Sequence, residues 1–469
     1  MSLVLSKMKV GYLPLINKGG GVFNDVFDWE STNVIIEQTI QVIESINSEV
    51  IYNGTPVNSP SDYKIIETLF LEKRIDVLFV HTLNISGGES LYKLIQHLQV
   101  PVIIAAVPEP DMLFNAPYTH RYASFCGGQW NVNMMYLLDK KVKFLFGLPQ
   151  EEQFQKDLDV TLQTINIIRH LTDWKVCVVG DKTPGYYGAI CSEDMLMRKF
   201  GAVKCYLDFG MLKKLCKDIS EEEINAFISK EYSLHKVAPQ LKSLHIKNTV
   251  RIFLALQDYA KREGINSYTM KCVPETIEVL GAAPCGVNSL LTEHDLISGC
   301  EGDILSTLSM YIASLYSKRA SLMVDIMSIR SPNDANCMLV WHCGAGAPSI
   351  AAQNEVTYRE SPLLINCDGI PQGVCVDFIP SFSTITMSQL SEDWKNGQYR
   401  YFAISGKAAE TKPYIGGNAL NIQFPLSAEE IGHTIIDNAL PHHFQISNGD
   451  ILAYIKELCY WKDIHFIAD

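Results

Sequence analysis

The sequence lacks the features that mark secreted, membrane and nucleic-acid-binding proteins. The N-terminus has no basic segment followed by an apolar stretch, and no apolar run reaches the roughly 18 residues that a membrane span needs. Lys and Arg form no dense run, and 39 basic residues stand against 52 acidic ones, a net charge of −13. An acidic chain is repelled by nucleic-acid phosphates. We therefore expect a cytoplasmic protein whose partners include neither a membrane nor a nucleic acid.

The short motifs of zinc, redox and nucleotide sites are also missing. The 13 cysteines form no CxxC pair, and several lie inside apolar runs, such as Cys177 within residues 175–179, as reduced and buried cysteines do in cytosolic proteins. The strand at 174–179 runs into a glycine turn at Gly180 and then a helix, an order that can hold phosphate. Its spacing matches neither GxGxxG nor GxxxxGK, so an ordinary strand-to-helix loop is favoured.

The length and composition predict more than one hydrophobic core. The chain has 469 residues, of which 47% are hydrophobic and 19% charged, an ordinary profile for a globular protein. A chain of this length divides into two to four domains by general scaling. No repeat of the solenoid kind is present.

The first two thirds of the chain alternate strands with helices. Apolar strands are expected at 10–15, 75–80, 100–105 and 174–179, and helices at 34–46, 63–71, 92–98, 154–168 and 192–200. Residues 251–257 read as a further buried strand or the start of a helix. Apolar strands separated by helices indicate parallel sheets covered on both faces. We therefore predict two doubly wound α/β domains, at residues 1–148 and 149–318.

The last third changes to short strands separated by polar and glycine-rich turns. Alternating or apolar runs occur at 373–379, 383–387 and 399–405, followed by a helix at 451–460 and a strand at 464–467. This pattern is typical of an antiparallel sheet or a small barrel. A C-terminal domain with an antiparallel β-barrel is predicted for residues 319–469.

Four separated segments contain the polar residues that could carry chemistry. They are 298–303 with Glu301 and Asp303, 321–326 with Asp325, 340–346 with His342, and 440–444 with His442 and His443. Asp303 could simply cap the helix that follows it, and Glu301 could favour the dipole of that helix. The histidines could be core or loop residues. Asp325 is harder to explain this way, because a carboxylate inside an apolar run needs a partner or a metal.

Taken together, two carboxylates with one or two histidines can hold one divalent cation. This donor set suits Mn²⁺, Mg²⁺, Co²⁺ or Zn²⁺. No local spacing such as HExxH marks the site, so the pattern by itself leaves the ligands open.

At these segments the chain resembles the L-fucose/L-arabinose isomerase family. The resemblance rests on residues 300–304, 324–325, 342–344 and 441–449 and on their order. It implies two α/β domains before a barrel domain, with Mn²⁺ held by Glu301, Asp325 and His443. The same Glu301 and Asp325 would be catalytic. His342 resembles a metal ligand in the arabinose branch of the family and a substrate contact elsewhere. His442 is expected to bind the substrate, and whether it also binds the metal stays open.

The predicted function is a metal-dependent aldose–ketose isomerase acting through an enediol on a free sugar of the fucose or arabinose type. The resemblance also implies a homo-oligomer, a trimer or hexamer. In it a neighbour's first domain, near Asn17, Lys18 and 19–21, would help to close the pocket. Two alternatives remain: a metal-dependent aldolase or epimerase with related chemistry, and a non-catalytic sugar-binding or sensor protein.

Overall fold

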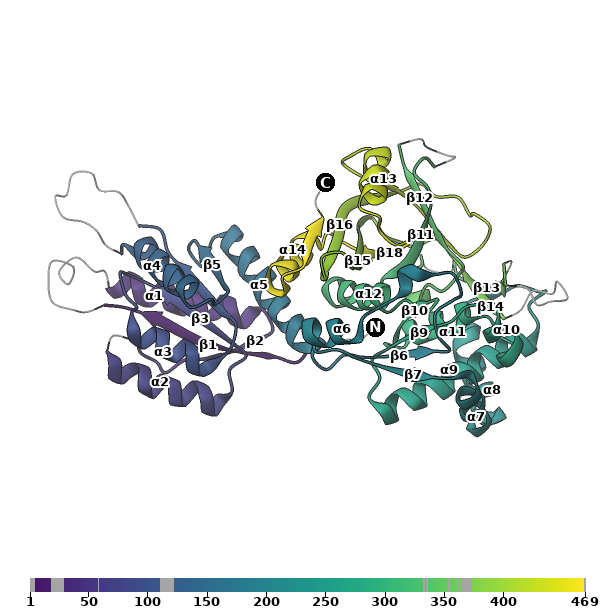
Figure 1. The fold of residues 1–469 in the computed structure, drawn as a ribbon, viewed down its shortest axis with the longest axis horizontal. Helices are drawn as coiled ribbons and strands as arrows, with labels where there is room; N and C mark the ends of the chain where they lie inside the picture. Colours follow the sequence, from purple (N-terminus) through teal and green to yellow (C-terminus); the bar gives the residue numbers. More distant parts are fainter. Residues whose placement is uncertain are drawn as a thin grey trace. The chain divides into compact units, whose positions relative to one another are not determined.

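The chain divides into two compact units, which Figure 1 shows as ribbons. The computed structural model describes residues 5–17, 29–57, 59–109, 122–331, 334, 336–352, 355–361, 363–364 and 373–467. One unit comprises Leu5–Asn166 and the other begins at Ile167. Within the described residues no helix combines the length and the apolar character that crossing a membrane requires. The finer domain boundaries after residues 148 and 318 stay a prediction.

The first unit is a doubly wound α/β domain, as predicted. Its sheet has the order β2-β1-β3-β4-β5, and every pairing in it is parallel. Its strands are β1 (Met8–Leu15), β2 (Ser48–Ile51), β3 (Val77–Thr82), β4 (Val102–Ala106) and β5 (Val142–Phe146). Its helices are α1 (Trp29–Ser45), α2 (Pro60–Lys73), α3 (Glu89–Leu98) and α4 (Ser124–Leu137). Buried side chains of α2, α3 and α4 pack together on one face of the sheet. Thr39 of α1 interacts with Tyr12, whose side chain points to the other face.

The second unit begins with another all-parallel sheet, in the order β10-β9-β6-β7. Its strands are β6 (Lys175–Val179), β7 (Val203–Leu207), β9 (Ser267–Met270) and β10 (Ile297–Cys300). Helix α5 (Glu152–Leu171) begins in the first unit and ends in the second. The other helices of this region are α6 (Glu193–Phe200), α7 (Phe209–Leu215), α8 (Glu221–Glu231), α9 (Ser243–Glu263), α10 (Glu275–Leu280) and α11 (Pro284–Glu293). Residues 251–257, expected as a strand or a helix start, lie inside α9. Short 3₁₀ helices occur at Tyr187–Ala189, Cys216–Asp218, Tyr232–Leu234 and Pro348–Ile350.

The C-terminal part forms the predicted antiparallel barrel. Six strands follow one another in the order β15-β18-β11-β12-β17-β16, and a pairing of β15 with β16 closes the ring. They are β11 (Leu322–Ser328), β12 (Met338–His342), β15 (Thr384–Asp393), β16 (Gln398–Ala409), β17 (Asn418–Gln423) and β18 (His443–Asn448). Outside the ring lie β19 (His465–Ile467), a small sheet of β14 (Val374–Asp377), β13 (Thr357–Glu360) and β8 (Lys236–Val237), and helices α13 (Ala428–Asp437) and α14 (Leu452–Lys462).

Helix α12 (Ile304–Ser317) joins the second parallel sheet to the barrel. Every residue from Ile304 to Tyr316 is buried. A helix that is apolar on all sides packs against protein on all sides, and α12 contacts β9 and β10 as well as β11, β15 and β18. Asp303 caps its first turn by accepting a hydrogen bond from the Ser306 N–H. The helix therefore gives the loop before it a rigid support.

This packing predicts that truncating a buried side chain of α12 strongly destabilises the folded chain. Leu308→Ala, at a fully buried position, should lower the free energy of unfolding by about 2–5 kcal/mol, because it leaves a cavity in a packed core. Leu234→Ala, where the side chain is 62% exposed, should change it by less than about 0.5 kcal/mol. Urea unfolding followed by tryptophan fluorescence measures both. Equal losses in the two variants would contradict the central packing role of α12.

Candidate metal and active site

The predicted polar residues come together on one side of the barrel, where it faces the start of α12. Glu301 follows β10 directly, Asp325 lies on β11, and His443 begins β18. Asp325 and His443 are direct partners across the antiparallel β11–β18 pair. Directly opposed residues place their side chains on the same face of a sheet. Three segments separated along the chain thus supply one cluster.

The backbone before α12 is held in a conformation that few side chains adopt. Glu301 has φ 62° and Gly302 has φ 78°, in the left-handed region that costs a residue with a side chain roughly 1–2 kcal/mol. A Cβ at Gly302 would lie 2.6 Å from the Cα of Lys182, so only glycine fits there. The Thr183 N–H donates to the Glu301 carbonyl at 3.1 Å. Close packing against the loop after β6 therefore fixes the direction of the Glu301 side chain.

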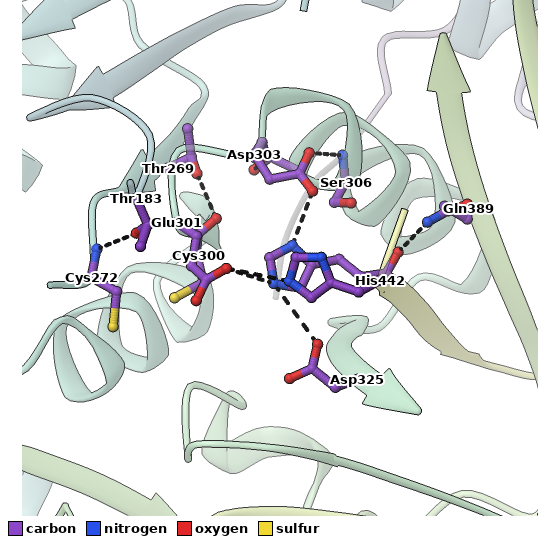
Figure 2. Close-up of polar contacts among 12 residues, drawn as sticks. Thr183, Thr269, Cys272, Cys300, Glu301, Asp303, Ser306, Asp325, Gln389 and His442 are labelled. Carbon is purple, nitrogen blue, oxygen red and sulfur yellow. Dashed lines mark hydrogen bonds and ion pairs between the residues drawn. The ribbon is translucent and has the colours of Figure 1, made fainter. Parts of the chain in front are cut away.

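The side chains of this cluster approach to near-contact distances (Figure 2). Glu301 Oε2 lies 3.4 Å from Nε2 of His442 and 3.4 Å from Nε2 of His443. Asp325 Oδ1 lies 4.0 Å from Nε2 of His443. One ligand atom each from Glu301, His442 and His443 falls within 4.8 Å of the others. The His443 side chain is 1% exposed and that of His442 is 45% exposed. His443 therefore lies at the buried base of the cluster, and His442 lies at its solvent-exposed mouth.

Several polar atoms in this cluster are buried without a hydrogen-bond partner. They are Oε2 of Glu301, Oδ1 of Asp325 and Nδ1 of His342. Burying a carboxylate oxygen without a partner costs free energy. A divalent cation would satisfy these oxygens, and carboxylates with imidazole suit Mn²⁺, Mg²⁺, Co²⁺ or Zn²⁺. The residues present therefore fit the predicted metal.

His342 lies beside this cluster, slightly apart from it. It ends β12, and its ring centroid is 6.0 Å from that of His443. Burial, above all, lowers its pKa. A neutral imidazole at this place can donate or accept one hydrogen bond at each nitrogen. The ligand set of Glu301, Asp325 and His443, with His342 and His442 as substrate contacts, stays a prediction that the geometry accommodates.

The charges in the buried base favour an ion pair between Asp303 and His443. Burial alone would lower the pKa of His443, but its hydrogen bond to Asp303 and the charges of Asp303, Asp325 and Glu301 raise it. Burial alone would raise the pKa of Asp303, but hydrogen bonds from His443 and Ser306 hold it below the usual value. Asp303 is therefore ionised at neutral pH. The helix-cap role expected for it is confirmed, and the bond to His443 was not foreseen.

Tyr186 is a further residue at the mouth that the sequence did not single out. Its ring centroid is 5.0 Å from that of His442. The negative charge of Glu301, helped by burial, raises the pKa of Tyr186, so its hydroxyl stays a donor. Tyr186 belongs to the glycine-bearing loop after β6, and a Cβ at Gly188 would lie 3.0 Å from Pro441. Loops at the carboxyl ends of parallel strands form ligand sites, a signal that could have found this residue.

Gln389 holds the turn that carries the two adjacent histidines. It lies on β15, and its side-chain Nε2 donates to the carbonyls of Pro441 at 2.6 Å and His443 at 2.7 Å. The side chain is fully buried. The amide therefore ties both ends of the turn to the barrel. Nothing in the sequence marked it, because its partners are 52 and 54 residues away.

One predicted segment belongs to the first unit. Asn17 lies in the first unit, where its N–H donates to Oδ1 of Asn84 at 2.8 Å. Lys18 and residues 19–21 lie outside the described residues. Their predicted contribution to a neighbour's pocket stays a prediction.

Comparison with known proteins identifies similar enzymes. No family model matches the chain. A sulfoquinovose isomerase from Priestia megaterium is 25% identical over 438 residues, which are 92% of this chain and 94% of that protein. Sulfoquinovose isomerases from Alkalicoccus urumqiensis and Clostridium sp. are 24% and 23% identical, covering 82% and 95% of this chain and 84% and 96% of their own lengths. These relatives share one enzyme name along nearly their whole length. The chain is an isomerase, an intramolecular oxidoreductase, as the sequence predicted.

Solved structures offer only weak likenesses. A solute-binding protein from Agrobacterium vitis, bound with α-D-tagatopyranose, matches 67% of this chain and 90% of its own at 11% identity and a TM-score of 0.16. At that TM-score the likeness says nothing about fold or function.

The turn that carries the histidines should loosen when Gln389 is lost. Gln389→Leu keeps the size of the side chain but removes the donor to the Pro441 and His443 carbonyls, so we expect about 1–3 kcal/mol less stability and faster hydrogen exchange in residues 440–444. Gln423→Leu, at an exposed position of β17, is the matched control and should change neither. Protection at 440–444 equal to that of the unmodified chain would show that Gln389 does not hold the turn.

Proposed function

We propose that this chain is an aldose–ketose isomerase that acts on a free sugar and uses a divalent cation, Mn²⁺. The observation that supports it is the convergence of two unpartnered buried carboxylate oxygens, Glu301 Oε2 and Asp325 Oδ1, on the Nε2 side of His443. Isomerisation moves one hydrogen between C2 and C1 of the sugar. It requires a carboxylate that can take a proton at one carbon and return it at the other.

Glu301, Asp325 and His443 are the residues that would hold the cation. A cation bound there supplies Lewis-acid polarisation of the sugar carbonyl, which makes the neighbouring C–H more acidic. Asp325, whose side chain is 29% exposed, faces the open side and takes the proton from C2. The protonated carboxyl then returns it to C1 of the resulting enediol, while the proton of the O2 hydroxyl passes to O1, which leaves a ketone at C2. The strained turn at Glu301 holds the Glu301 carboxylate, the second one of the site, in place during both proton transfers.

The remaining polar residues bind and orient the sugar. His442 lies at the mouth beside the Tyr186 ring, where both can meet sugar hydroxyls. His342 is buried behind them, and its free Nδ1 can form a hydrogen bond with a sugar oxygen. Aromatic and imidazole groups around one face of a sugar exclude water from the reacting carbons, which strengthens the electrostatic contacts inside.

The substrate named by the relatives is sulfoquinovose, and we propose it as the first sugar to test. L-Fucose, D-arabinose and L-arabinose are the next sugars to test, because the family resemblance implies them. The alternative of an aldolase or epimerase shares the first proton transfer and differs in its product. A non-catalytic sugar sensor is the other alternative. It does not explain why carboxylate oxygens are buried without hydrogen bonds, an arrangement that lowers the stability of the folded chain.

The test of this function is an isomerase assay on the metal-stripped protein. The four sugars are incubated with and without added Mn²⁺, and ketose formation is followed by proton NMR in D₂O, where the label enters at the carbon that is reprotonated. We expect ketose from at least one sugar only when the cation is present. Cleavage products would instead support an aldolase, and a changed aldose an epimerase. No conversion with the cation bound would contradict the proposal.

Asp325 gives the sharpest test of the proposed roles. Asp325→Asn keeps the size and hydrogen bonding of the side chain but removes its charge and its ability to take a proton. Turnover should fall by about 10²–10⁴-fold, with weaker cation binding and little change in melting temperature. Asp393→Asn, at a solvent-exposed turn of the same barrel, should leave turnover unchanged. An Asp325→Asn protein with full activity and full metal content would remove Asp325 from the site.

We also propose, from the family resemblance, that the chain is cytoplasmic and assembles into a trimer or hexamer. Sedimentation velocity at micromolar concentration should show a single species of that size. A stable monomer that isomerises sugar would overturn the proposed assembly.

A further inference from the structure

Both carboxylate oxygens of Asp303 are occupied by different partners. Oδ1 accepts the Ser306 N–H at 2.9 Å, which caps α12, and Oδ2 lies 3.0 Å from Nδ1 of His443. Asp303 is 3% exposed and His443 is 1% exposed, so water does not compete for either contact. A short, rigid link thus connects the first turn of α12 with a residue 140 positions later.

This contact determines which nitrogen of His443 carries the hydrogen. An ionised carboxylate only accepts hydrogen bonds, so Nδ1 of His443 must be the donor. In the neutral ring the other nitrogen, Nε2, then has no hydrogen and presents its lone pair. That lone pair points to the side where Glu301 Oε2 lies at 3.4 Å and Asp325 Oδ1 at 4.0 Å. Two acidic oxygens and a free lone pair repel one another unless a cation lies between them.

The neighbouring histidine has no such support. Within the described part of the chain, the contacts of His442 are Glu301 at its Nε2 and the rings of Tyr186 and His443. Its side chain is 45% exposed, so its ring can turn and change tautomer. Of the two adjacent histidines, only His443 is held in one orientation and one tautomer.

We propose that Asp303 is a positioning residue that makes His443 a ligand for a divalent cation. It does so by holding Nδ1–H and thereby presenting the bare Nε2 to the site. This inference rests on the proposed function and deepens it, because it gives Asp303 a role and gives the physical reason why His443 rather than His442 would be the ligand. Metal-binding histidines commonly donate their second N–H to a carboxylate, and loss of that carboxylate typically weakens metal affinity about 10–100-fold.

Asp303→Asn tests this with the helix cap preserved. The amide oxygen can still accept the Ser306 N–H, since Asn and Asp cap helices about equally well. Its NH₂ then faces Nδ1 of His443 and needs an acceptor there, which moves the hydrogen to Nε2 and blocks the ligand position. Calorimetric titration with Mn²⁺ in the absence of sugar should show a dissociation constant about 10–100-fold higher than that of the unmodified chain. An unchanged dissociation constant would overturn the proposal.

The chain offers a matched control at another helix. Asp208 caps α7 in the same way, accepting the Met211 N–H at 2.9 Å. Asp208→Asn, at a solvent-exposed cap, should leave Mn²⁺ affinity unchanged. If both variants lose affinity equally, the effect is one of general stability and the positioning role fails. Should Asp303→Asn not fold, Asp303→Ser keeps a cap oxygen and removes the partner of His443, with the same expected loss.

A second readout separates this inference from the proposed function. In alkaline buffer, ¹⁵N NMR of the histidine side chains in metal-free protein distinguishes the two neutral tautomers, and His443→Gln identifies the His443 signals. The unmodified chain should show Nδ1–H at His443, and Asp303→Asn should show Nε2–H. The same tautomer in both proteins would overturn the positioning role. The expected switch, in a protein that isomerises no sugar, would support the role of Asp303 while refuting the function.

Discussion

The cost of burying negative charge governs the region where the barrel meets α12. Glu301, Asp303 and Asp325 lie within one cluster with His443, and Asp303 and His443 are almost wholly shielded from water. Asp303 is compensated by the helix N–H groups and by His443. Glu301 and Asp325 each keep a buried oxygen without a hydrogen bond. Such an imbalance persists in a folded protein when it serves binding or catalysis, and it is the basis of the proposed cation site.

The surrounding scaffold keeps this cluster in place. Helix α12 is buried on all sides, and Gly302 allows the loop after β6 to pack directly against the Glu301 turn. Gln389 fixes the Pro441–His443 turn through two hydrogen bonds to its carbonyls. Each support belongs to a strand, a helix or a turn that is itself fully packed. Groups that must meet a sugar within a few tenths of an ångström require such rigid elements.

The sequence predicted the architecture better than the contacts within the site. Apolar runs located β1, β3 and β4 of the first parallel sheet and β6 of the second, but missed β2, β5, β7, β9 and β10. The runs at 383–387 and 399–405 became barrel strands, whereas 373–379 became β14, outside the barrel. Burial patterns are local properties of the chain, which is why a sequence can show them. Glu301, Asp325 and His443 were found because carboxylates and histidines at the ends of apolar runs are conspicuous. The preference for His443 over His442 came from the family resemblance alone, because its physical basis is Asp303, 140 residues before His443. Tyr186 and Gln389 were missed for the same reason: their roles arise only when distant segments meet.

The central claim is that Glu301, Asp325 and His443 bind one divalent cation between them. The most direct measurement is anomalous X-ray scattering from crystals soaked in MnCl₂, recorded on both sides of the manganese absorption edge. The account predicts one strong manganese peak in contact with Glu301, Asp325 and Nε2 of His443, with His442 outside the coordination sphere. A peak bound through His442 in place of His443, or a cluster that stays free of manganese, would contradict it.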